Sequence, residues 1–349
     1  MGTSGTAIGT AESLTAYNLF NLVHLTLRSL NVLKEGTATG GSTTTVIDTA
    51  LLSRYEDDYW NGGTVGITYD GGGASAAPEG EFAVISNSDS SLSTVTCGTL
   101  TAAVASGDKY FIADDTYQLY DVIGAINRSL NNIEIPIWDE TSVGDIAANQ
   151  TEYSLPSDAK RGASSRKLRV WLERDKNDSN DQRWVEILNW RVEHSGIGGN
   201  ADVLVLPYQY NSGYAVALEY AAPHPTLIAA SDSLNEEVPW EMVVYSATVD
   251  LLWWRKSLFD WQDYQEIMPM FNKDGEVVGT EQMQTNWQKY KADQGQINDM
   301  IVKYEQMLED VKRTHPMKLP RSPNEVLALS KTGGSLTGED SEPNLVYLV

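Results

Sequence analysis

A cluster of acids and aromatic rings offers the first candidate chemistry. In residues 55–60, consecutive carboxylates are flanked on both sides by aromatic side chains. These residue types suit glycoside hydrolysis, in which two carboxyl groups face each other across a cleft and one has a raised pKa. Asp57, Asp58 and the more distant Glu79 would be the acids. Because neighbouring acids on one segment do not establish such a pair, we interpret the segment as a solvated loop anchored by its rings, with hydrolysis as an alternative.

A second acidic run, residues 175–186, imitates a calcium-binding loop. Oxygen-bearing side chains stand at its first, third and fifth positions, and Glu186 stands at its twelfth. The sixth residue is Asn180 where the calcium loop needs glycine, and the ninth is Arg183. The flanking residues 170–173 and 184–188 have the composition of strands rather than helices. The run is therefore predicted to be the polar loop of a β-hairpin.

Other signatures of catalysis or cofactor binding are missing from the sequence. No phosphate-binding loop, dinucleotide fingerprint or nucleophile elbow is present. Cys97 is the only cysteine, so an internal disulfide is excluded. The histidines are scattered, and none has a second histidine or cysteine at ligand spacing; they are His24, His194, His224 and His315. We therefore expect no catalytic residue, no metal and no cofactor.

Composition limits the classes of partner. The 349 residues carry 25 basic and 48 acidic side chains, a net charge of −23. A broad basic face for nucleic acid is therefore not expected, although an acidic wall would let DNA slide past without sticking. No apolar run is long enough to span a membrane, and the amino-terminal residues do not resemble a secretory signal.

The hydrophobic pattern divides the chain into alternating helical and β segments. We expect a first helix within residues 1–35, whose helical pattern runs from Ser13 to Leu33, and a second helix at 116–135 that Pro136 closes. Between them we expect a β module at 36–115, whose strands include residues 64–69 and 109–113. A second β module at 136–230, two further helices at 231–314 and an extended arm at 315–349 follow. The third helix is rich in tryptophan, and its indoles are interpreted as core and interface residues rather than as base- or sugar-stacking groups: Trp240, Trp253, Trp254 and Trp261.

The last helix, residues 283–311, carries one narrow apolar seam at alternating steps of four and three residues, broken only at Gln294. Its members are Met283, Trp287, Tyr290, Ile297, Ile301, Tyr304, Leu308 and Val311. Such a seam is typical of helices that lie nearly parallel. The predicted fold class is therefore α+β: an antiparallel, up-down helical bundle with two inserted small β modules, each a barrel or sandwich, and an extended C-terminal arm.

Several segments resemble structural proteins of tailed bacteriophages. Residues 58–68, 77–82 and 101–110 look like a β module common in those proteins. Other segments resemble head-to-tail adaptor (connector, or neck) proteins: residues 123–130, residues 150–156, Trp184 with 190–192, and Pro239 leading into 247–255. The resemblance covers roughly residues 13–313, and its motifs are packing signatures rather than catalytic ones. The first β module makes this chain longer than simple adaptors.

The resemblance implies a non-enzymatic virion protein located in the neck, and in the host cytoplasm during assembly. It implies a homo-oligomeric ring of about twelve copies beneath the portal protein, with helices around the DNA channel. Its partners would be the portal, a tail or nozzle protein, fibre proteins, and double-stranded DNA that passes without specific binding. The C-terminal arm would dock on the portal through Leu345, Val346, Tyr347, Leu348 and Val349.

Two points stay open on the sequence alone. Carboxylates of the last helix lie off the apolar seam and would face either the DNA channel or outer solvent; they are Asp293, Asp299, Glu305, Glu309 and Asp310. The alternative function is that of another phage tail or fibre-attachment protein, which would bind a partner protein or a glycan through its β modules.

Overall fold

The computed structural model describes residues 17–73, 76–156, 159, 168–173, 184–193, 202–267 and 281–315, and it describes 258–267 and 281–293 by their backbone alone. The chain divides into two compact units. The first unit comprises Met1–Ile133 and Pro223–Met317, and the second comprises Glu134–Ala222 and Lys318–Val349. The segment Glu134–Ala222 of the second unit is thus inserted between the two segments of the first.

The first unit contains a closed β-barrel. Its strands are β1 (Leu33–Thr37), β2 (Gly40–Gly41), β3 (Thr45–Ile47), β4 (Thr64–Tyr69), β5 (Phe82–Asp89), β6 (Thr94–Cys97) and β7 (Lys109–Ala113). They pair in the order β1-β7-β4-β5-β6-β3-β2, and their pairs are antiparallel. The two ends of this order, β1 and β2, are consecutive in the chain: the Ala38 N–H donates to Asp108 of the β7 side and the Thr39 N–H to Ile47 of β3. The sheet therefore closes on itself.

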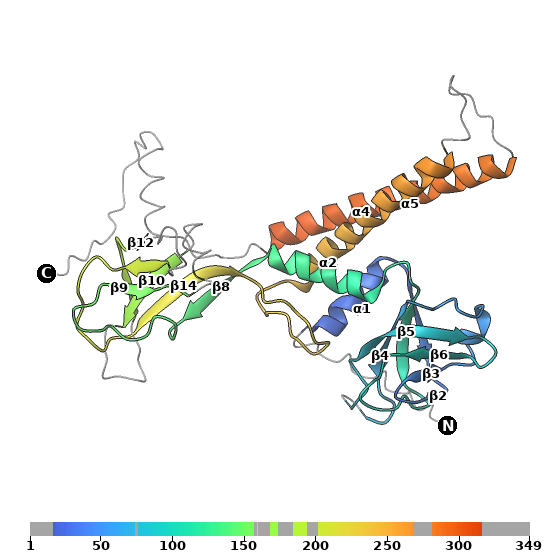
Figure 1. Cartoon of the computed structure of the whole chain (residues 1–349), viewed down its shortest axis with the longest axis horizontal. Coiled ribbons are helices and arrows are strands. Elements are labelled where there is room, and N and C mark those ends of the chain that lie inside the picture. Colours follow the sequence, from blue (N-terminus) through green and yellow to red (C-terminus); the bar gives the residue numbers. More distant parts are fainter. Residues whose placement is uncertain are drawn as a thin grey trace, which may run out of the picture. The chain divides into compact units, whose positions relative to one another are not determined.

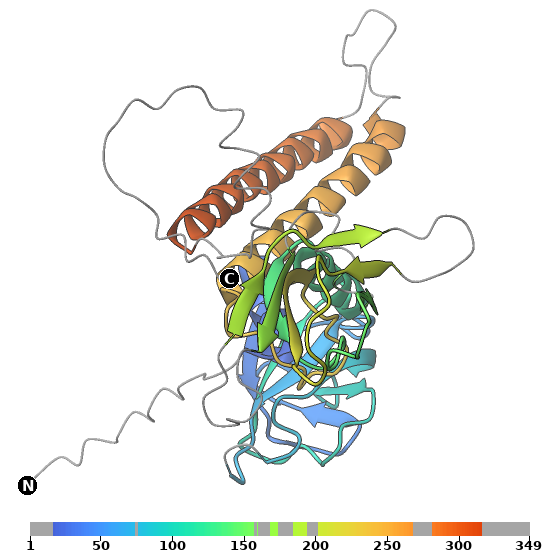
Figure 2. The ribbon, with the colours of Figure 1, turned by 90° about the vertical axis from the view of Figure 1, so that its left-hand side faces the viewer.

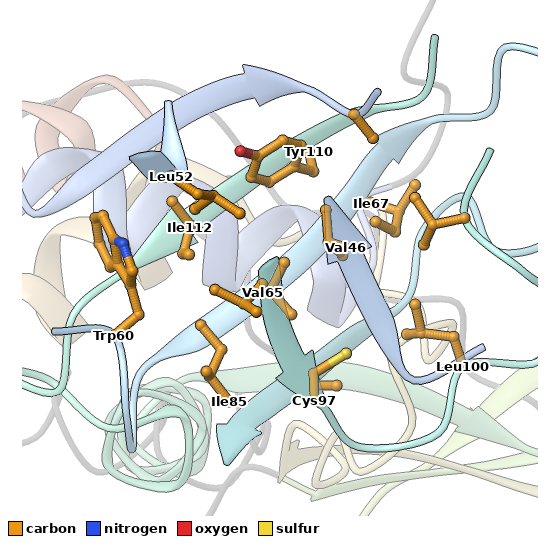
Figure 3. Packing of buried hydrophobic residues seen from close by; sticks show 14 residues of the cluster. Val46, Leu52, Trp60, Val65, Ile67, Ile85, Cys97, Leu100, Tyr110 and Ile112 are labelled. Carbon is orange, nitrogen blue, oxygen red and sulfur yellow. The ribbon is translucent and has the colours of Figure 1, made fainter. Parts of the chain in front are cut away.

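Alternation along the barrel strands fills the interior with apolar side chains (Figure 3). Tyr110 and Ile112 of β7 point inward, beside Val65 of β4 and Val46 of β3. One buried carboxylate lies among them. Asp48 is 2% exposed, and it accepts hydrogen bonds from the Tyr110 hydroxyl at 2.9 Å and from the backbone N–H groups of residues 50 and 51 at 2.8 and 3.1 Å. A buried charge is tolerated only when its hydrogen bonds are made, as they are here.

Four helices complete the first unit: α1 (Leu19–Ser29), α2 (Leu119–Asn131), α4 (Trp240–Ile267) and α5 (Glu281–Thr314). The Asn18 side chain caps α1 by accepting from the Asn21 N–H at 3.0 Å. Helices α1, α2 and α4 contact one another, and an Arg128–Asp250 ion pair at 2.6 Å joins α2 to α4. Figures 1 and 2 show α4 and α5 side by side, running in opposite directions.

Helix α1 is also the element that rests on the barrel. Phe20 lies 6.3 Å from Phe82 of β5 and 5.7 Å from Phe111 of β7 between ring centroids. One turn later, the His24 imidazole stacks on Phe111 at 5.0 Å. Because Phe111 alternates with Tyr110 and Ile112, it points out of the barrel and toward this helix. A single strand, β7, therefore supplies both the barrel interior and the contact with α1.

The second unit is a β-sandwich. A four-stranded sheet has the order β11-β10-β14-β8, and a three-stranded sheet has the order β12-β13-β9. Their strands are β8 (Glu134–Asp139), β9 (Glu152–Ser154), β10 (Leu168–Glu173), β11 (Trp184–Ile187), β12 (Arg191–Glu193), β13 (Val203–Val205) and β14 (Val216–Pro223). Val170 and Leu218 of the larger sheet share one core with Tyr153 and Leu204 of the smaller.

The predicted helical bundle with small β inserts is therefore wrong. The described residues form four helices and three antiparallel sheets with 14 strands, 29% helix and 30% strand. Sequence periodicity overextended the first two helices. The first was predicted to reach Leu33, but α1 ends at Ser29; Asn31 then adopts a left-handed φ of 59° and the chain turns directly into β1. Pro136 was interpreted as a helix stop, but it lies inside β8.

Candidate functional site

The apolar seam of α5 is used within the chain wherever its side chains are described. Ile301 is 3% exposed and Tyr304 is buried, while Ile297, Leu308 and Val311 are half-buried. The Tyr304 ring lies 5.7 Å from Tyr245 of α4, and its hydroxyl donates to the Ser29 carbonyl of α1 at 2.9 Å. This part of the seam therefore fastens α5 to its own subunit. The side chains of Met283, Trp287 and Tyr290 lie outside the described residues.

The carboxylates predicted to lie off the seam are exposed at Asp299, Glu305, Glu309 and Asp310, and the Asp293 side chain lies outside the described residues. Glu309 pairs with Lys312, and Asp310 with Arg313, each at 2.8 Å and one turn away. Because two of these acids face cations, the end of α5 presents mixed charge rather than a purely acidic surface.

Two of the tryptophans of α4 are exposed rather than in the core. Trp253 and Trp254 are 48% and 40% exposed, and Val302 of α5 is 53% exposed. The Trp253 indole N–H points to Glu305 at 3.4 Å, one turn after Val302, and the Lys256 ammonium lies 4.7 Å above its ring. We call Trp253, Trp254 and Val302 the helix patch. Of the other tryptophans in this segment, Trp240 is half-buried and stacks on Tyr17 at 5.1 Å, while the Trp261 side chain lies outside the described residues.

The acid–aromatic segment is a loop held by its rings, as the sequence predicted. Trp60 is buried, with its ring centroid 4.7 Å from that of Tyr55. Asp57 accepts two hydrogen bonds from Ser90 at 2.8 Å, and Asp58 accepts one from the Asn61 amide at 2.8 Å. Glu79 accepts from a backbone N–H, that of residue 70, at 3.1 Å. These carboxylates therefore fix turns of the barrel.

A cavity of about 300 Å³ opens between α1 and the barrel. It is lined by His24, Glu35, Gly36, Thr37, Thr68, Lys109 and Tyr110. Burial lowers the pKa of His24, whereas Glu35, 3.5 Å from its Nε2 atom, raises it; the net direction is downward. The imidazole is therefore neutral at pH 7. Within the described residues, no group of three or more His, Cys, Asp or Glu side chains could hold a metal.

The segment that imitates a calcium loop connects the two strands of a hairpin, which confirms its interpretation. Strands β10 and β11 pair antiparallel, with Glu173 opposite Trp184. Glu186 is already engaged by both the Nε and an Nη atom of Arg169, each at 2.8 Å. The loop itself, residues 174–183, lies outside the described part of the chain.

Sequence reasoning missed a cluster of indoles on the larger sheet of the second unit. Trp138 of β8 lies 5.8 Å from Trp171 of β10 and 5.4 Å from Trp184 of β11. Alternation along β10 places Trp171 on the face opposite the core residues Leu168 and Val170. We call Trp138, Trp171 and Trp184 the tryptophan platform. The alternation of residues 168–172 was a usable signal, but Trp138 was hidden because its strand was not predicted.

Arg169 holds this platform in place. Its guanidinium carbon lies 4.5 Å from the centre of the Trp171 ring, and it also pairs with Glu219 at 3.2 Å. Glu219 in turn accepts from the Trp171 indole N–H at 3.1 Å. The hydrogen bonds with Glu186 are the main cause of a raised pKa at Arg169. The network is therefore a fixed arrangement of rings and charges on a rigid sheet.

The proposed portal-docking residues, Leu345–Val349, lie outside the described residues. No helix in the described part of the chain is both long and apolar enough to cross a membrane. Comparison of the sequence with models of known protein families and with curated proteins finds no match.

Proposed function

We propose that this chain is a structural virion protein, a head-to-tail adaptor that forms a ring between the portal and the tail of a tailed phage. The proposal starts from the resemblance over residues 13–313. The observation that carries it furthest is the helix patch: two partly exposed indoles on a long, rigid helix pair. Large exposed apolar side chains of this kind mark protein interfaces, and tryptophan is the residue type most enriched at interface hot spots.

In this proposal the helix patch, rather than the described half of the α5 seam, contacts the neighbouring subunit. Ile301 and Tyr304 are already buried by contacts within the chain. Trp253 and Trp254 retain about half of their surface for a partner. A closed ring needs two different surfaces on each copy, so the patch would meet another region of the next subunit rather than its own equivalent.

The ring is tested by measuring the mass of the full-length chain, alone and with purified portal protein, by native mass spectrometry. We expect a closed oligomer that the double variant Trp253→Ala, Trp254→Ala loses while it stays folded. Tyr120→Ala is the matched control, because Tyr120 is an exposed aromatic on α2. A chain that stays monomeric at micromolar concentration even with portal would contradict the proposal.

Passage of DNA is the second part of the proposal, with the exposed Asp299 and Glu309 on the channel wall. Changing both to lysine should create attachment to double-stranded DNA that weakens steeply with salt. The matched control is Glu140→Lys and Asp202→Lys in the second unit, which adds the same charge elsewhere. Equal DNA attachment by both variants would place the α5 acids on outer solvent instead.

A second candidate function is that of a tail or fibre-attachment protein that binds a protein or glycan through its β modules. The tryptophan platform favours a protein ligand, because the exposed Trp138 ring beside the half-buried Trp171 and Trp184 offers an aromatic contact on the sheet. Imaging of virions labelled on this chain separates the two: label at the neck supports the adaptor, and label at the tail periphery supports the alternative. No catalytic role is proposed, because Asp57, Asp58 and Glu79 serve turns of the barrel.

A further inference from the structure

We propose that the tryptophan platform docks a segment of a partner protein that presents an arginine or lysine side chain to Trp138 and Glu140. This inference rests on the sheet of the second unit, and it stands or falls independently of the ring. It names the chemistry of the partner, which the proposed function leaves open.

The first observation is that the platform already binds one cation in this manner. Arg169 stacks on Trp171 at 4.5 Å while two of its nitrogen atoms pair with Glu186 at 2.8 Å. A guanidinium that lies over an indole and also pairs with a carboxylate combines cation–π attraction with a bidentate ion pair. Trp138 repeats the ring and the carboxylate of this arrangement. Its indole N–H donates to Glu140 at 2.6 Å, as that of Trp171 donates to Glu219, and its side chain is 43% exposed. The cation is the missing third part.

The charge around the rings favours the same partner. Glu140 and Glu219 accept hydrogen bonds from the indoles, Glu186 pairs with Arg169, and Arg169 is the cation of this group. Among the residues that the structure describes around the platform, carboxylates therefore outnumber cations. Glu140 is exposed and lies at the side of Trp138. An incoming cation gains from this imbalance, whereas an acidic segment or a phosphate would be repelled.

The ring geometry argues against a glycan on the same surface. Trp138 lies at 50° to Trp171 and at 80° to Trp184, so the three rings form a compact ridge rather than a flat floor for successive sugars. The indole N–H groups of Trp138 and Trp171 already donate to carboxylates and are not available to sugar hydroxyls. One exposed ring with an adjacent carboxylate instead offers a binding surface that matches a single basic side chain.

The test uses the full-length chain labelled with 5-fluorotryptophan, observed by fluorine NMR in about 0.15 M salt, where distant charges are screened. The Trp138 resonance is assigned with Trp138→Phe. The probes are the blocked peptide Gly-Arg-Gly-Arg-Gly, the same peptide with glutamate for arginine, and a neutral glucose hexasaccharide. We expect the arginine peptide alone to shift the Trp138 resonance in a saturable way.

Variants separate the platform from general attraction to an acidic protein. The Trp138 resonance is absent from the Trp138 variants, so the affinity of every variant for the arginine peptide is measured by isothermal titration calorimetry. Trp138→Ala and Glu140→Gln should each weaken binding of the arginine peptide about fivefold, and Trp138→Phe should weaken it less. Tyr208→Ala is the matched control, because Tyr208 is another exposed aromatic of the second unit, and it should bind like the unmodified chain. Glu140→Gln changes an exposed side chain, so it keeps the test valid even where Trp138→Ala disturbs the sheet.

Three results would overturn the inference. The first is peptide binding of equal strength in Glu140→Gln and Tyr208→Ala, which would show only general charge attraction. The second is a Trp138 response to the saccharide and not to the peptide, which would assign the surface to a glycan. The third is no Trp138 response to any probe at millimolar concentration. None of these results bears on whether the chain forms a ring.

Discussion

Replacing Ile301 by alanine should destabilise the subunit itself, not merely its association with other copies. Ile301 is 3% exposed on the face of α5 that contacts α4. The change removes about three methylene equivalents, worth ~0.8 kcal/mol each, and the cavity left behind adds to this loss. The free energy of unfolding should therefore fall by about 3 kcal/mol. The neighbouring Val302 is 53% exposed, and Val302→Ala should change it by less than about 0.5 kcal/mol.

The measurement is urea unfolding of dilute, full-length protein, followed by far-ultraviolet circular dichroism, which reports chiefly on the helices of the first unit. Sedimentation of the same samples gives the association state. The reasoning would be refuted if Ile301→Ala unfolded like the parent chain while self-association was lost. That outcome would mean that the seam faces a neighbouring subunit and that its packing on α4 is exchanged during assembly.

Three further changes test other parts of the first unit. Tyr110→Phe leaves the buried Asp48 carboxylate one hydrogen bond short and should cost about 1–3 kcal/mol in urea unfolding. Burial lowers the pKa of His24 below 6.5, so His24 is protonated at a higher pH in the unfolded chain than in the folded chain. The stability of the fold should therefore decrease as the pH drops below about 6.5, and His24→Gln should flatten this part of the plot of thermal-unfolding midpoint against pH. Gly63→Ala would drive a Cβ atom into the backbone oxygen of Ala113 in β7 and should prevent stable folding. Gly40→Ala, whose Cβ atom would meet nothing within 4 Å, should be tolerated; soluble yield and circular dichroism distinguish the two variants.

The strands that sequence analysis located best are those with both period-two alternation and a glycine-rich turn. Residues 64–69 and 109–113 were predicted as strands, and the structure has β4 and β7 at these positions. Their flanks, 61–63, 70–73 and 106–108, contain the turn residues that end each strand. The hairpin of β10 and β11 was likewise predicted from its strand-like flanks.

Other features depend on tertiary contacts that local pattern does not contain. Strand β1 has the sequence Leu-Lys-Glu-Gly-Thr, which lacks apolar alternation and pairs with β7 only because the barrel closes there. The exposure of Trp253 and Trp254 was also unpredictable, because helical spacing tells which residues share a face but not whether another helix covers it. The tryptophan platform joins residues far apart in sequence through pairings across β8, β14, β10 and β11.

The insertion of the second unit into the first has a consequence for synthesis. The barrel is complete once residue 113 has been made, but α1 and α2 must wait for α4, which begins at Trp240. At ~5–20 residues per second this delay is on the order of 10 s. During it, the buried apolar side chains of α1 and α2 lack the α4 helix that both helices contact in the folded chain. A nascent chain released before residue 240 would thus carry a folded barrel joined to helices whose apolar faces are exposed to solvent. The interval between α2 and α4 is therefore when the growing polypeptide most needs protection from aggregation.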